Sequence, residues 1–170
     1  MPKIGIISDT HDNLQALDNL LNKFEERGVK SLIHAGDIIA PFTLKRILER
    51  NFEFNGVFGN NDGELLTLSK IAEKNGVFIS QQPLILEFSN AEMVILHGAG
   101  GILETRKFVE SLAKSGDYNV IVYGHTHELD VRRMGKVLII NPGEVCGYLS
   151  GISTAVIFDP EKFETEVVKL

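Results

Sequence analysis

The first half of the chain alternates apolar, strand-like runs with amphipathic segments. The run from Lys3 to Ser8 is rich in β-branched residues, which predicts a strand. A helix ending near Gly28 should follow, because apolar residues then recur at helical spacing at Leu14, Leu17, Leu20, Leu21 and Phe24. The alternation continues as strand, helix, strand and helix over Ser31 to His34, Pro41 to Glu49, Phe54 to Phe58 and Glu64 to Asn75. Such alternation favours a sheet with parallel strands.

From Val77 onward the pattern predicts mostly strands. Short strands separated by turn residues indicate a hairpin region over Val77 to Ser80, Leu84 to Phe88 and Met93 to Leu96, with turns at Gln82-Pro83 and Ser89-Asn90. After one more helix near Ile102 to Ala113, strands are expected at Asn119 to Tyr123, Leu129 to Met134, Val137 to Ile140, Thr154 to Phe158 and Thr165 to Val168. About ten strands are uncommon in one flat sheet of a chain this short. We therefore predict an α/β fold with two packed sheets flanked by helices.

Composition favours a single domain over residues 1–170 and argues against several classes of protein. With 44% hydrophobic residues, the chain can bury one substantial core. Its apolar stretches are far shorter than the roughly 20 residues of a membrane-spanning helix, and its N-terminus lacks the features of a secretion signal. A formal net charge of −6 disfavours binding to long nucleic acid. We expect a cytoplasmic protein that binds neither membranes nor long nucleic acid.

The single cysteine, Cys146, limits the metal chemistry that the chain can support. One cysteine forms no internal disulfide and no cysteine-rich zinc cluster. Any metal ion must therefore be held by histidine, aspartate, glutamate and asparagine side chains.

Five polar segments follow apolar runs at the points where predicted strands end. They are Ser8-Asp9-Thr10-His11, Ala35-Gly36-Asp37, Gly59-Asn60-Asn61-Asp62, Leu96-His97-Gly98 and Gly124-His125-Thr126-His127. In open α/β sheets, ligands bind outside the carboxyl ends of the strands. We therefore expect these five segments to converge on one crevice.

Most of these segments also have an ordinary structural explanation. Asp12 with Gln15 matches a helix-capping pattern. Gly36-Asp37 and the segment from Gly59 to Gly63 are typical of turns, and His97 could be a hydrogen-bonded core histidine. Taken one at a time, these residues leave the structural and the functional interpretations open.

The pair His125 and His127 gives the strongest indication of metal binding, because two imidazoles beside a glycine offer neighbouring nitrogen donors. Together the segments supply two carboxylates, one amide and four imidazoles, a set suited to Mn, Fe, Ni or Zn and larger than one ion needs. A carboxylate can bridge, which suggests Asp37 between two metals roughly 3.5–4 Å apart. Two dications, less Asp9, Asp37 and a bridging hydroxide, leave a positive centre that attracts phosphate.

The ordered motifs Asp-x-His, Gly-Asp, Gly-Asn-x-Asp, His-Gly and Gly-His-x-His resemble the calcineurin-like metallophosphoesterase superfamily. The resemblance runs from Ser8 to Gly143, and the short chain with its Asn-Pro-Gly at Asn141 to Gly143 is most similar to the small YfcE-type phosphodiesterase branch. It implies a four-layer α/β/β/α sandwich of two mixed sheets flanked by helices. It also implies the hydrolysis of a small phosphodiester by a metal-bridged hydroxide.

The resemblance further implies two divalent transition metal ions, most readily manganese, with nickel, iron or zinc as alternatives. One metal would be held by Asp9, His11, Asp37 and His127, and the other by Asp37, Asn60, His97 and His125.

One position departs from the pattern of the superfamily. Many members carry a histidine, thought to protonate the leaving group, where this chain has Asn61. We expect Asn61 to act catalytically by donating a hydrogen bond to a phosphoryl oxygen, with weaker activity or a preference for leaving groups that need little protonation. Asp62 is expected to brace a metal ligand, since ligating histidines commonly donate their other N–H to a carboxylate or carbonyl. His34 is interpreted as structural, Cys146 as a small buried thiol and Asn141 as a turn residue.

Two other functions stay open at this point. One is a non-catalytic scaffold of the same fold, as in a retromer subunit of the superfamily, although every ligand position is filled here. The other is a nucleotide-binding module around Gly98-Ala99-Gly100-Gly101, which fits less well because Leu103 replaces the third glycine of the fingerprint. The substrate, the native metal and association into a homo-oligomer are not determined by the sequence.

Overall fold

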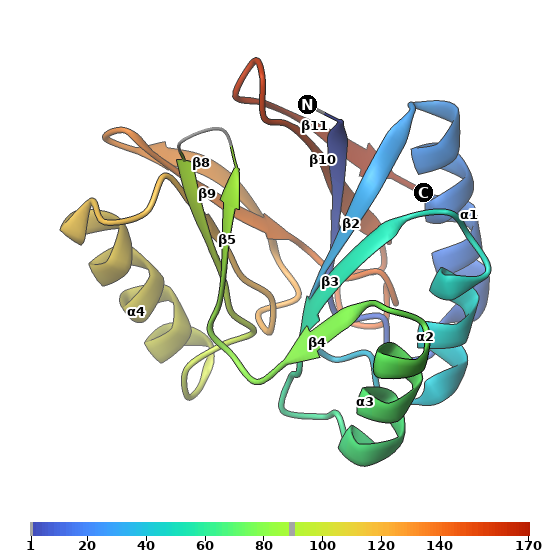
Figure 1. The fold of residues 1–170 in the computed structure, drawn as a ribbon. Helices are drawn as coiled ribbons and strands as arrows, with labels where there is room; N and C mark the ends of the chain where they lie inside the picture. The colour runs from blue at the N-terminus through green and yellow to red at the C-terminus, as the bar shows by residue number, and fades with distance from the viewer. Residues whose placement is uncertain (1, 89–90) are drawn as a thin grey trace.

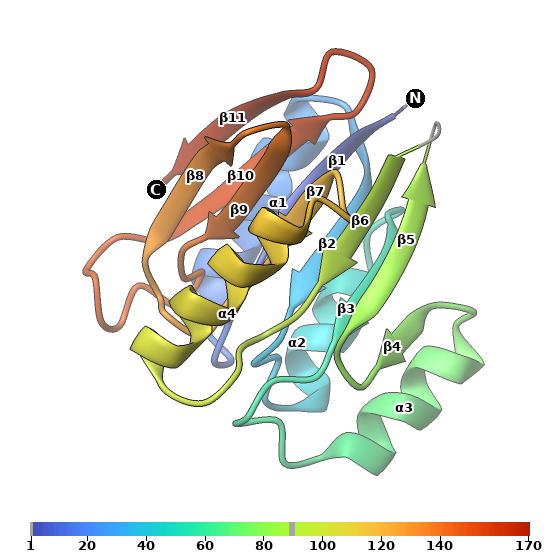
Figure 2. The ribbon, with the colours of Figure 1, turned by 90° about the vertical axis from the view of Figure 1, so that its left-hand side faces the viewer.

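Two mixed β-sheets form the centre of the molecule, and helices cover both outer faces (Figures 1 and 2). The structure is a computed structural model that describes residues 2–88 and 91–170. In Figure 2, α4 (Ile102–Ser115) lies in front of one sheet, and the other sheet lies behind that one. The helices α1 (Leu14–Glu26), α2 (Pro41–Leu48) and α3 (Leu65–Lys74) lie at the back. The predicted four-layer α/β/β/α sandwich is confirmed.

The first sheet has the strand order β11-β10-β1-β2-β3-β4. Its strands are β1 (Lys3–Ile7), β2 (Val29–Ala35), β3 (Glu53–Val57), β4 (Phe78–Ser80), β10 (Thr154–Asp159) and β11 (Glu164–Lys169). The strands β1 to β4 run parallel, and β10 and β11 complete the sheet in antiparallel pairing. The carboxyl ends of β1, β2 and β3 therefore lie next to one another at the same end of the sheet.

The second sheet has the strand order β5-β6-β7-β9-β8. Its strands are β5 (Leu84–Phe88), β6 (Ala91–Ile95), β7 (Val120–Val122), β8 (Leu129–Met134) and β9 (Val137–Pro142). The three central strands β6, β7 and β9 are parallel, and antiparallel strands form both edges. A tight turn at Gly135-Lys136 joins β8 to β9, since Met134 pairs with Val137.

Helices pack on the outer faces of the two sheets because each has an apolar stripe. The helices are α1 (Leu14–Glu26), α2 (Pro41–Leu48), α3 (Leu65–Lys74) and α4 (Ile102–Ser115). In α1 the buried residues Leu17, Leu20, Leu21 and Phe24 follow helical spacing, and Pro41 occupies the first turn of α2, where its missing N–H costs nothing. None of the described helices has the length and apolar character needed to cross a lipid bilayer.

Three apolar cores hold the four layers together. Leu17, Leu32 and Ile47 belong to the core between the first sheet and its helices. Ile95 and Val156 belong to the core between the two sheets. A third core, which includes Val109 and Ile121, joins the second sheet to α4. Each sheet thus buries both faces, which explains the nearly continuous apolar runs of the central parallel strands.

Three local predictions differ from the structure. The hairpin region does not begin at Val77, because β4 pairs in parallel with β3 in the first sheet. Asn141 is not a turn residue but a buried residue of β9. The cap of α1 is Asn13, whose side chain accepts the N–H of Ala16. The predicted turn at Ser89-Asn90 lies outside the described residues.

Candidate metal centre

The five polar segments of the chain meet at one end of the two sheets. Asp9 and His11 follow β1, Asp37 follows β2 and Asn60 follows β3, all from the first sheet. His97 follows β6, while His125 and His127 follow β7, from the second sheet. All seven predicted ligand positions therefore lie on loops that leave the carboxyl ends of strands.

Asp37 lies between two groups of ligand atoms. Its Oδ2 atom is 3.3 Å from Nε2 of His11 and also 3.3 Å from Nε2 of His97. The Asp37 side chain is almost fully buried. One carboxylate oxygen thus faces a histidine from each sheet, which is the position that a bridging ligand requires.

The first group consists of Asp9, His11, Asp37 and His127. Their ligand atoms all lie within 4.8 Å of one another. Nε2 of His127 is 3.4 Å from Oδ1 of Asp9, and the rings of His11 and His127 stack with centroids 5.2 Å apart. The four donors therefore surround one small volume.

The second group consists of Asn60, His97 and His125, with Asp37 shared. Nε2 of His97 is 3.0 Å from Oδ1 of Asn60, and the His97 and His125 rings meet edge to face at a centroid distance of 5.2 Å. These three residues line a cavity of about 460 Å³. Each histidine pair thus has one member, His11 or His97, at 3.3 Å from Oδ2 of Asp37.

Hydrogen bonds orient the ligating nitrogens. Nδ1 of His97 lies 2.7 Å from the carbonyl oxygen of Ala35 and donates to it. Nδ1 of His127 lies 2.7 Å from Oε2 of Glu144, which accepts from it. With Nδ1 occupied in this way, the Nε2 atom of each ring presents its lone pair to the carboxylates.

The donor atoms fit divalent cations. Oδ1 of Asp9 and Nε2 of His11 are buried and make no hydrogen bond in the described part of the chain. Such orphaned polar atoms are costly unless a ligand satisfies them. Nitrogen and oxygen donors of this kind suit transition metal ions, and two buried carboxylates partly balance their charge.

Burial and neighbouring charges shift the pKa values of these groups. Burial raises the pKa of Asp9. Burial would also raise the pKa of Asp37, but the nearby imidazoles of His11 and His97 and the hydrogen bond from Asn61 outweigh it and hold that pKa well below its usual range. The Asp37 carboxylate in turn raises the pKa of His11, and for His97 it outweighs the opposite effect of burial. Asp37 is therefore ionised, as a metal ligand must be.

Close packing of the five loops depends on glycine. A Cβ atom on Gly124 would lie 2.0 Å from Oγ of Ser8, and one on Gly59 would lie 2.2 Å from Oδ1 of Asp37. The backbone is also strained, because φ is positive at Asp9, His11, Asp37, His125 and His127. Non-glycine residues with positive φ cluster at functional sites, where the surrounding structure holds them.

Comparison with known proteins identifies the family. The model of the calcineurin-like phosphoesterase superfamily domain matches residues 2–162. The chain belongs to the calcineurin-like phosphoesterase superfamily. It is 38% identical to phosphodiesterase MJ0936 of Methanocaldococcus jannaschii over 99% of each chain. It is also 28% identical to phosphodiesterase YfcE of Escherichia coli, over 85% of this chain and 80% of YfcE.

Solved structures of the superfamily share the fold. A structure described as a novel archaeal phosphodiesterase superposes with a TM-score of 0.89 at 38% identity, covering 99% of both chains. Vps29 of Chaetomium thermophilum superposes with a TM-score of 0.70 at 16% identity, covering all of this chain and 97% of Vps29. The second likeness concerns the fold alone.

Asn61 lies beside the carboxylate shared by the two ligand groups of this phosphoesterase fold. Its backbone N–H donates to Oδ1 of Asp37 at 2.9 Å, and its side-chain Nδ2 donates to Oδ2 at 2.7 Å. The side chain is exposed to solvent. Asn61 is thus within reach of the centre, and its predicted catalytic role stays a proposal.

The carboxylate of Asp62, which was predicted to brace a metal ligand, accepts from backbone N–H groups and not from a histidine. It receives the N–H groups of Ile39 at 2.6 Å and Gly59 at 2.7 Å. Asp62 therefore joins the loops after β2 and β3.

The carboxylate that does bind a ligating histidine is Glu144, which the sequence interpretation missed. Glu144 is fully buried, and hydrogen bonds from Cys146, Ser150 and His127 overcome burial to lower its pKa to about 2. Its sequence signal is weak: it follows the apolar run of β9, as the five polar segments follow theirs.

The remaining polar residues have structural partners. Asn141 donates to the carbonyl oxygen of Gly124 at 3.2 Å and to Oγ1 of Thr126 at 2.9 Å, which braces the loop with His125 and His127. His34 is fully buried, lies 3.1 Å from Oγ1 of Thr10, and has a pKa lowered by burial to about 3. Cys146 is buried, and burial together with Glu144 raises its pKa to about 12.

Proposed function

We propose that this chain is a dinuclear metal-dependent phosphoesterase that hydrolyses small phosphodiesters in the cytoplasm. The observation that carries the proposal is the position of Asp37, whose Oδ2 atom lies 3.3 Å from a histidine of each ligand group. Manganese is the metal we favour, with nickel, iron or zinc as alternatives that the same donors accept. The phosphodiesterase names of two relatives support the choice of substrate class.

The residues divide the work between binding and positioning. Asp9, His11 and His127 would hold one ion, and Asn60, His97 and His125 the other, with Asp37 shared. Two such ions supply charge neutralisation, orientation of the phosphoryl group and a lowered pKa for an attacking water. Glu144 and the carbonyl of Ala35 keep two imidazoles in the tautomer that can coordinate.

Asn61 would donate a hydrogen bond to the leaving-group oxygen or to an equatorial oxygen of the phosphate. A neutral amide donates a hydrogen bond but no proton, so it stabilises charge on a phosphoryl oxygen without acting as an acid. Esters with good leaving groups, such as p-nitrophenyl esters, should therefore react faster than alkyl esters. The hydrogen bond from its backbone N–H to Oδ1 of Asp37 holds Asn61 beside the shared carboxylate.

The test replaces the shared carboxylate. We expect Asp37→Ala to lower hydrolysis of bis-p-nitrophenyl phosphate with manganese at least roughly 100-fold and to reduce metal content from about two equivalents per chain to one or fewer. Asp12→Asn is the matched control, since Asp12 accepts from Oγ1 of Thr43 instead of facing the centre. Elemental analysis and steady-state kinetics measure both quantities.

Two outcomes would contradict the proposal. One is Asp37→Ala with unchanged activity and metal content. The other is wild-type protein that is inert toward a panel of phosphodiesters with each of the four metals, which would favour the scaffold alternative.

A further inference from the structure

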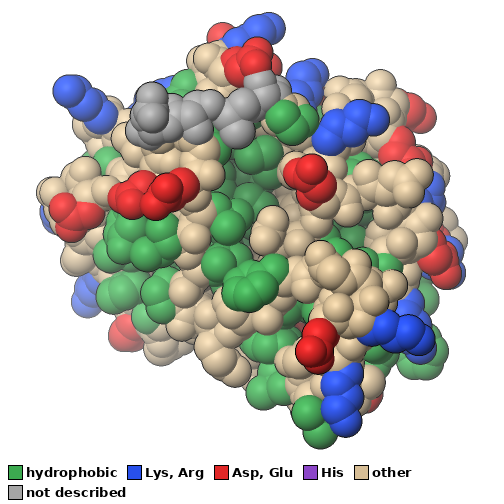
Figure 3. All heavy atoms as spheres, in the orientation of Figure 1, with side chains coloured by type: hydrophobic (Ala, Val, Ile, Leu, Met, Phe, Trp, Pro, Cys, Tyr) green, Lys and Arg blue, Asp and Glu red, His purple; other side chains and the backbone are tan. Residues whose placement is uncertain are grey.

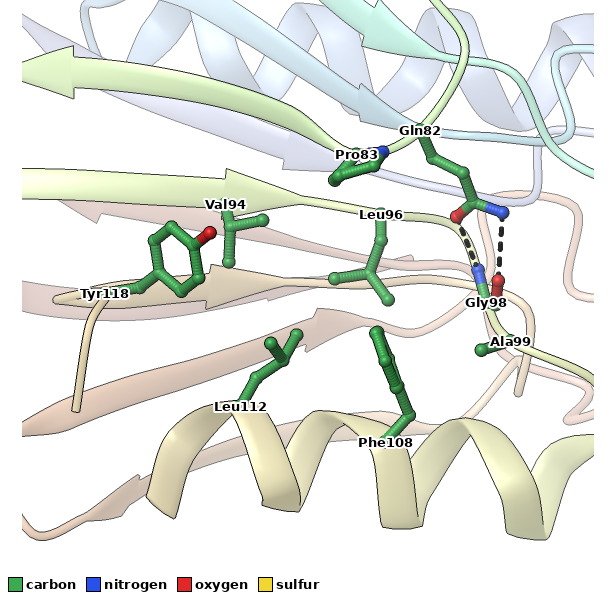
Figure 4. A pocket seen from close by; sticks show the side chains of 9 residues that line it. All are labelled: Gln82, Pro83, Val94, Leu96, Gly98, Ala99, Phe108, Leu112 and Tyr118. Atoms are coloured by element: carbon green, nitrogen blue, oxygen red, sulfur yellow. Dashed lines mark hydrogen bonds between the residues drawn. The ribbon is translucent and has the colours of Figure 1, made fainter. Parts of the chain in front are cut away.

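An apolar cavity lies beside the candidate metal centre, on the outer face of the second sheet. It has a volume of about 210 Å³ and lies between the β5–β6 edge and α4 (Figure 4). Figure 4 shows its side chains converging from both sides of this gap. The apolar lining comprises Pro83, Val94, Leu96, Phe108, Leu112 and Tyr118.

The apolar cavity adjoins the cavity that contains metal ligands. Gln82 and Gly98 line both of them. A Cβ atom on Gly98 would lie 2.9 Å from the side chain of His125, so this residue packs directly against one of the ligands. Gln82 and the backbone around Gly98 therefore lie between the second ligand group and the apolar lining.

Gln82 makes this shared wall rigid. Its Oε1 atom accepts the N–H groups of His97 at 2.6 Å and Gly98 at 3.1 Å, and its Nε2 donates to the carbonyl oxygen of Gly98 at 2.9 Å. Both heteroatoms of the amide are engaged with backbone. The hydrogen bonds therefore fix the shape of this wall. A substrate substituent that passes it toward the apolar cavity need not form hydrogen bonds with the Gln82 amide.

The mouth of the cavity exposes apolar surface. Phe108 is 46% exposed although it projects from α4 beside the cavity. Figure 3 shows apolar side chains gathered on the face between α4 and β5. The phenol of Tyr118 lies at the end of the cavity away from Gly98 (Figure 4). Two aromatic rings, one at each end, offer faces and edges to a planar apolar group.

The size of the cavity selects a single ring. An apolar cavity of about 150 Å³ binds benzene, so 210 Å³ accommodates one aromatic ring with a small substituent. A phosphodiester has two ester substituents, and with the phosphorus at the metal ligands one of them would pass along Gln82 and Gly98, the residues that line both cavities. We propose that this cavity binds an aromatic ester substituent, and that the substrates are aryl phosphodiesters. This inference rests on the proposed phosphodiesterase function.

The experiment compares two symmetrical diesters that differ only in their substituents. Calorimetric titration of the manganese-loaded protein measures the dissociation constants of diphenyl phosphate and dimethyl phosphate. We expect diphenyl phosphate to bind at least about tenfold more tightly, as expected for burial of apolar groups of this size. Leu112→Trp, which fills the cavity, should reduce that ratio toward one.

Leu103 provides the matched control on the same helix. It is 64% exposed and does not line the cavity, so Leu103→Trp should keep the wild-type ratio. Phe108→Ala is a second test that removes a ring at the surface without adding bulk to the core, and it should also lower the ratio, whereas Leu103→Ala should not. Thermal unfolding checks that each variant is folded.

The outcomes separate this inference from the function on which it rests. Equal affinity for both diesters in wild type, or a ratio unchanged by Leu112→Trp and Phe108→Ala, overturns the aryl subsite. Hydrolysis of bis-p-nitrophenyl phosphate by the same preparations shows whether the phosphodiesterase function stands. If the protein hydrolyses this ester but binds diphenyl phosphate and dimethyl phosphate with equal affinity, only the aryl subsite is refuted.

Discussion

At the scale of single residues, the carboxylate of Glu144 connects a metal ligand to a surface loop. Its Oε2 atom accepts from Nδ1 of His127 at 2.7 Å and from Sγ of Cys146 at 2.9 Å. Its Oε1 atom accepts the backbone N–H groups of Leu149 at 2.9 Å and Ser150 at 2.5 Å. The two oxygens therefore have different tasks, one toward the metal centre and one toward the loop.

This division predicts the effect of Glu144→Gln. The new carbonyl oxygen can accept both backbone N–H groups in place of Oε1, which leaves the amide NH₂ facing Nδ1 of His127. A donor there favours the tautomer with the proton on Nε2, the nitrogen that faces Asp9. We expect manganese affinity to fall roughly 10- to 100-fold, by analogy with other outer carboxylate partners.

Calorimetric titration with manganese measures this loss, and ¹⁵N chemical shifts of the imidazoles report the tautomer without any metal. Glu128→Gln is the control, because Glu128 follows His127 directly but its carboxylate is paired with Arg106. Wild-type affinity and an unchanged tautomer in Glu144→Gln would refute this account of Glu144.

Single residues differ in how far the sequence predicted them. The histidines and Asp37 lie in polar segments after apolar runs, and most of these segments contain glycine, so their types and positions already suggest ligands. Glu144 also follows a glycine and an apolar run, but a lone glutamate is normally exposed, and no local pattern indicates its burial against His127. Asp62 has the right type and location, but its partners are backbone N–H groups, which a sequence does not display.

At the scale of elements, the loops after β1, β2 and β7 interlock so tightly that a side chain is excluded at Gly124. Besides Ser8, a Cβ atom there would lie 2.7 Å from the carbonyl oxygen of Ala35 and 3.0 Å from Oδ2 of Asp9. The φ angle of Gly124 is not positive, so space and not backbone conformation requires the glycine.

We therefore expect Gly124→Ala to destabilise the fold by about 1–3 kcal/mol, the usual cost of overpacking, and to weaken metal binding by separating the loops. Gly63→Ala is the control near the same site, since Gly63 has ordinary φ and nothing within 4 Å of a Cβ atom. Urea unfolding and manganese titration measure the two effects. Equal stability of both variants would contradict the packing argument.

Helices and strands with a strong hydrophobic periodicity were predicted well. A strand whose position depends on which other strand it pairs with was predicted poorly. The extents of α1, α2 and β5 agree closely with the expected ranges. The three-residue strand β4 was assigned to the hairpin region, yet it pairs with β3. It follows α3, and a strand reached through a helix from its predecessor commonly returns parallel to it. The choice of partner depends on the whole sheet and not on the segment itself.

At the scale of the whole molecule, the proposed metal ligands come from both sheets and meet at one end of them. The first sheet supplies Asp9, His11, Asp37 and Asn60, and the second supplies His97, His125 and His127. The overall architecture followed from the number of strands and the chain length. The rule that ligands bind at the carboxyl ends of strands predicted that the five segments would meet. How the two sheets face each other, and hence the distances between these side chains, comes from long-range packing that no local pattern encodes.

Because metals at this centre would join the two sheets, we expect them to stabilise the fold. A ligand present at about 1,000 times its Kd contributes roughly 4 kcal/mol, which for a chain of this size corresponds to a rise in Tm of about 10 °C. Differential scanning calorimetry with manganese or with EDTA measures the difference. Asp37→Ala should abolish most of it, and an identical Tm under both conditions would contradict the expectation.

The left-handed backbone conformation is shared by Asp9, His11, Asp37, His125 and His127. At these positions the side chains that serve the reaction lower the thermal stability of the fold. Each such residue costs of order 1 kcal/mol that a glycine would not. A laboratory selection for heat resistance alone would then enrich glycine or asparagine at these same positions. The most heat-resistant variants from such a selection would have lost their catalytic activity.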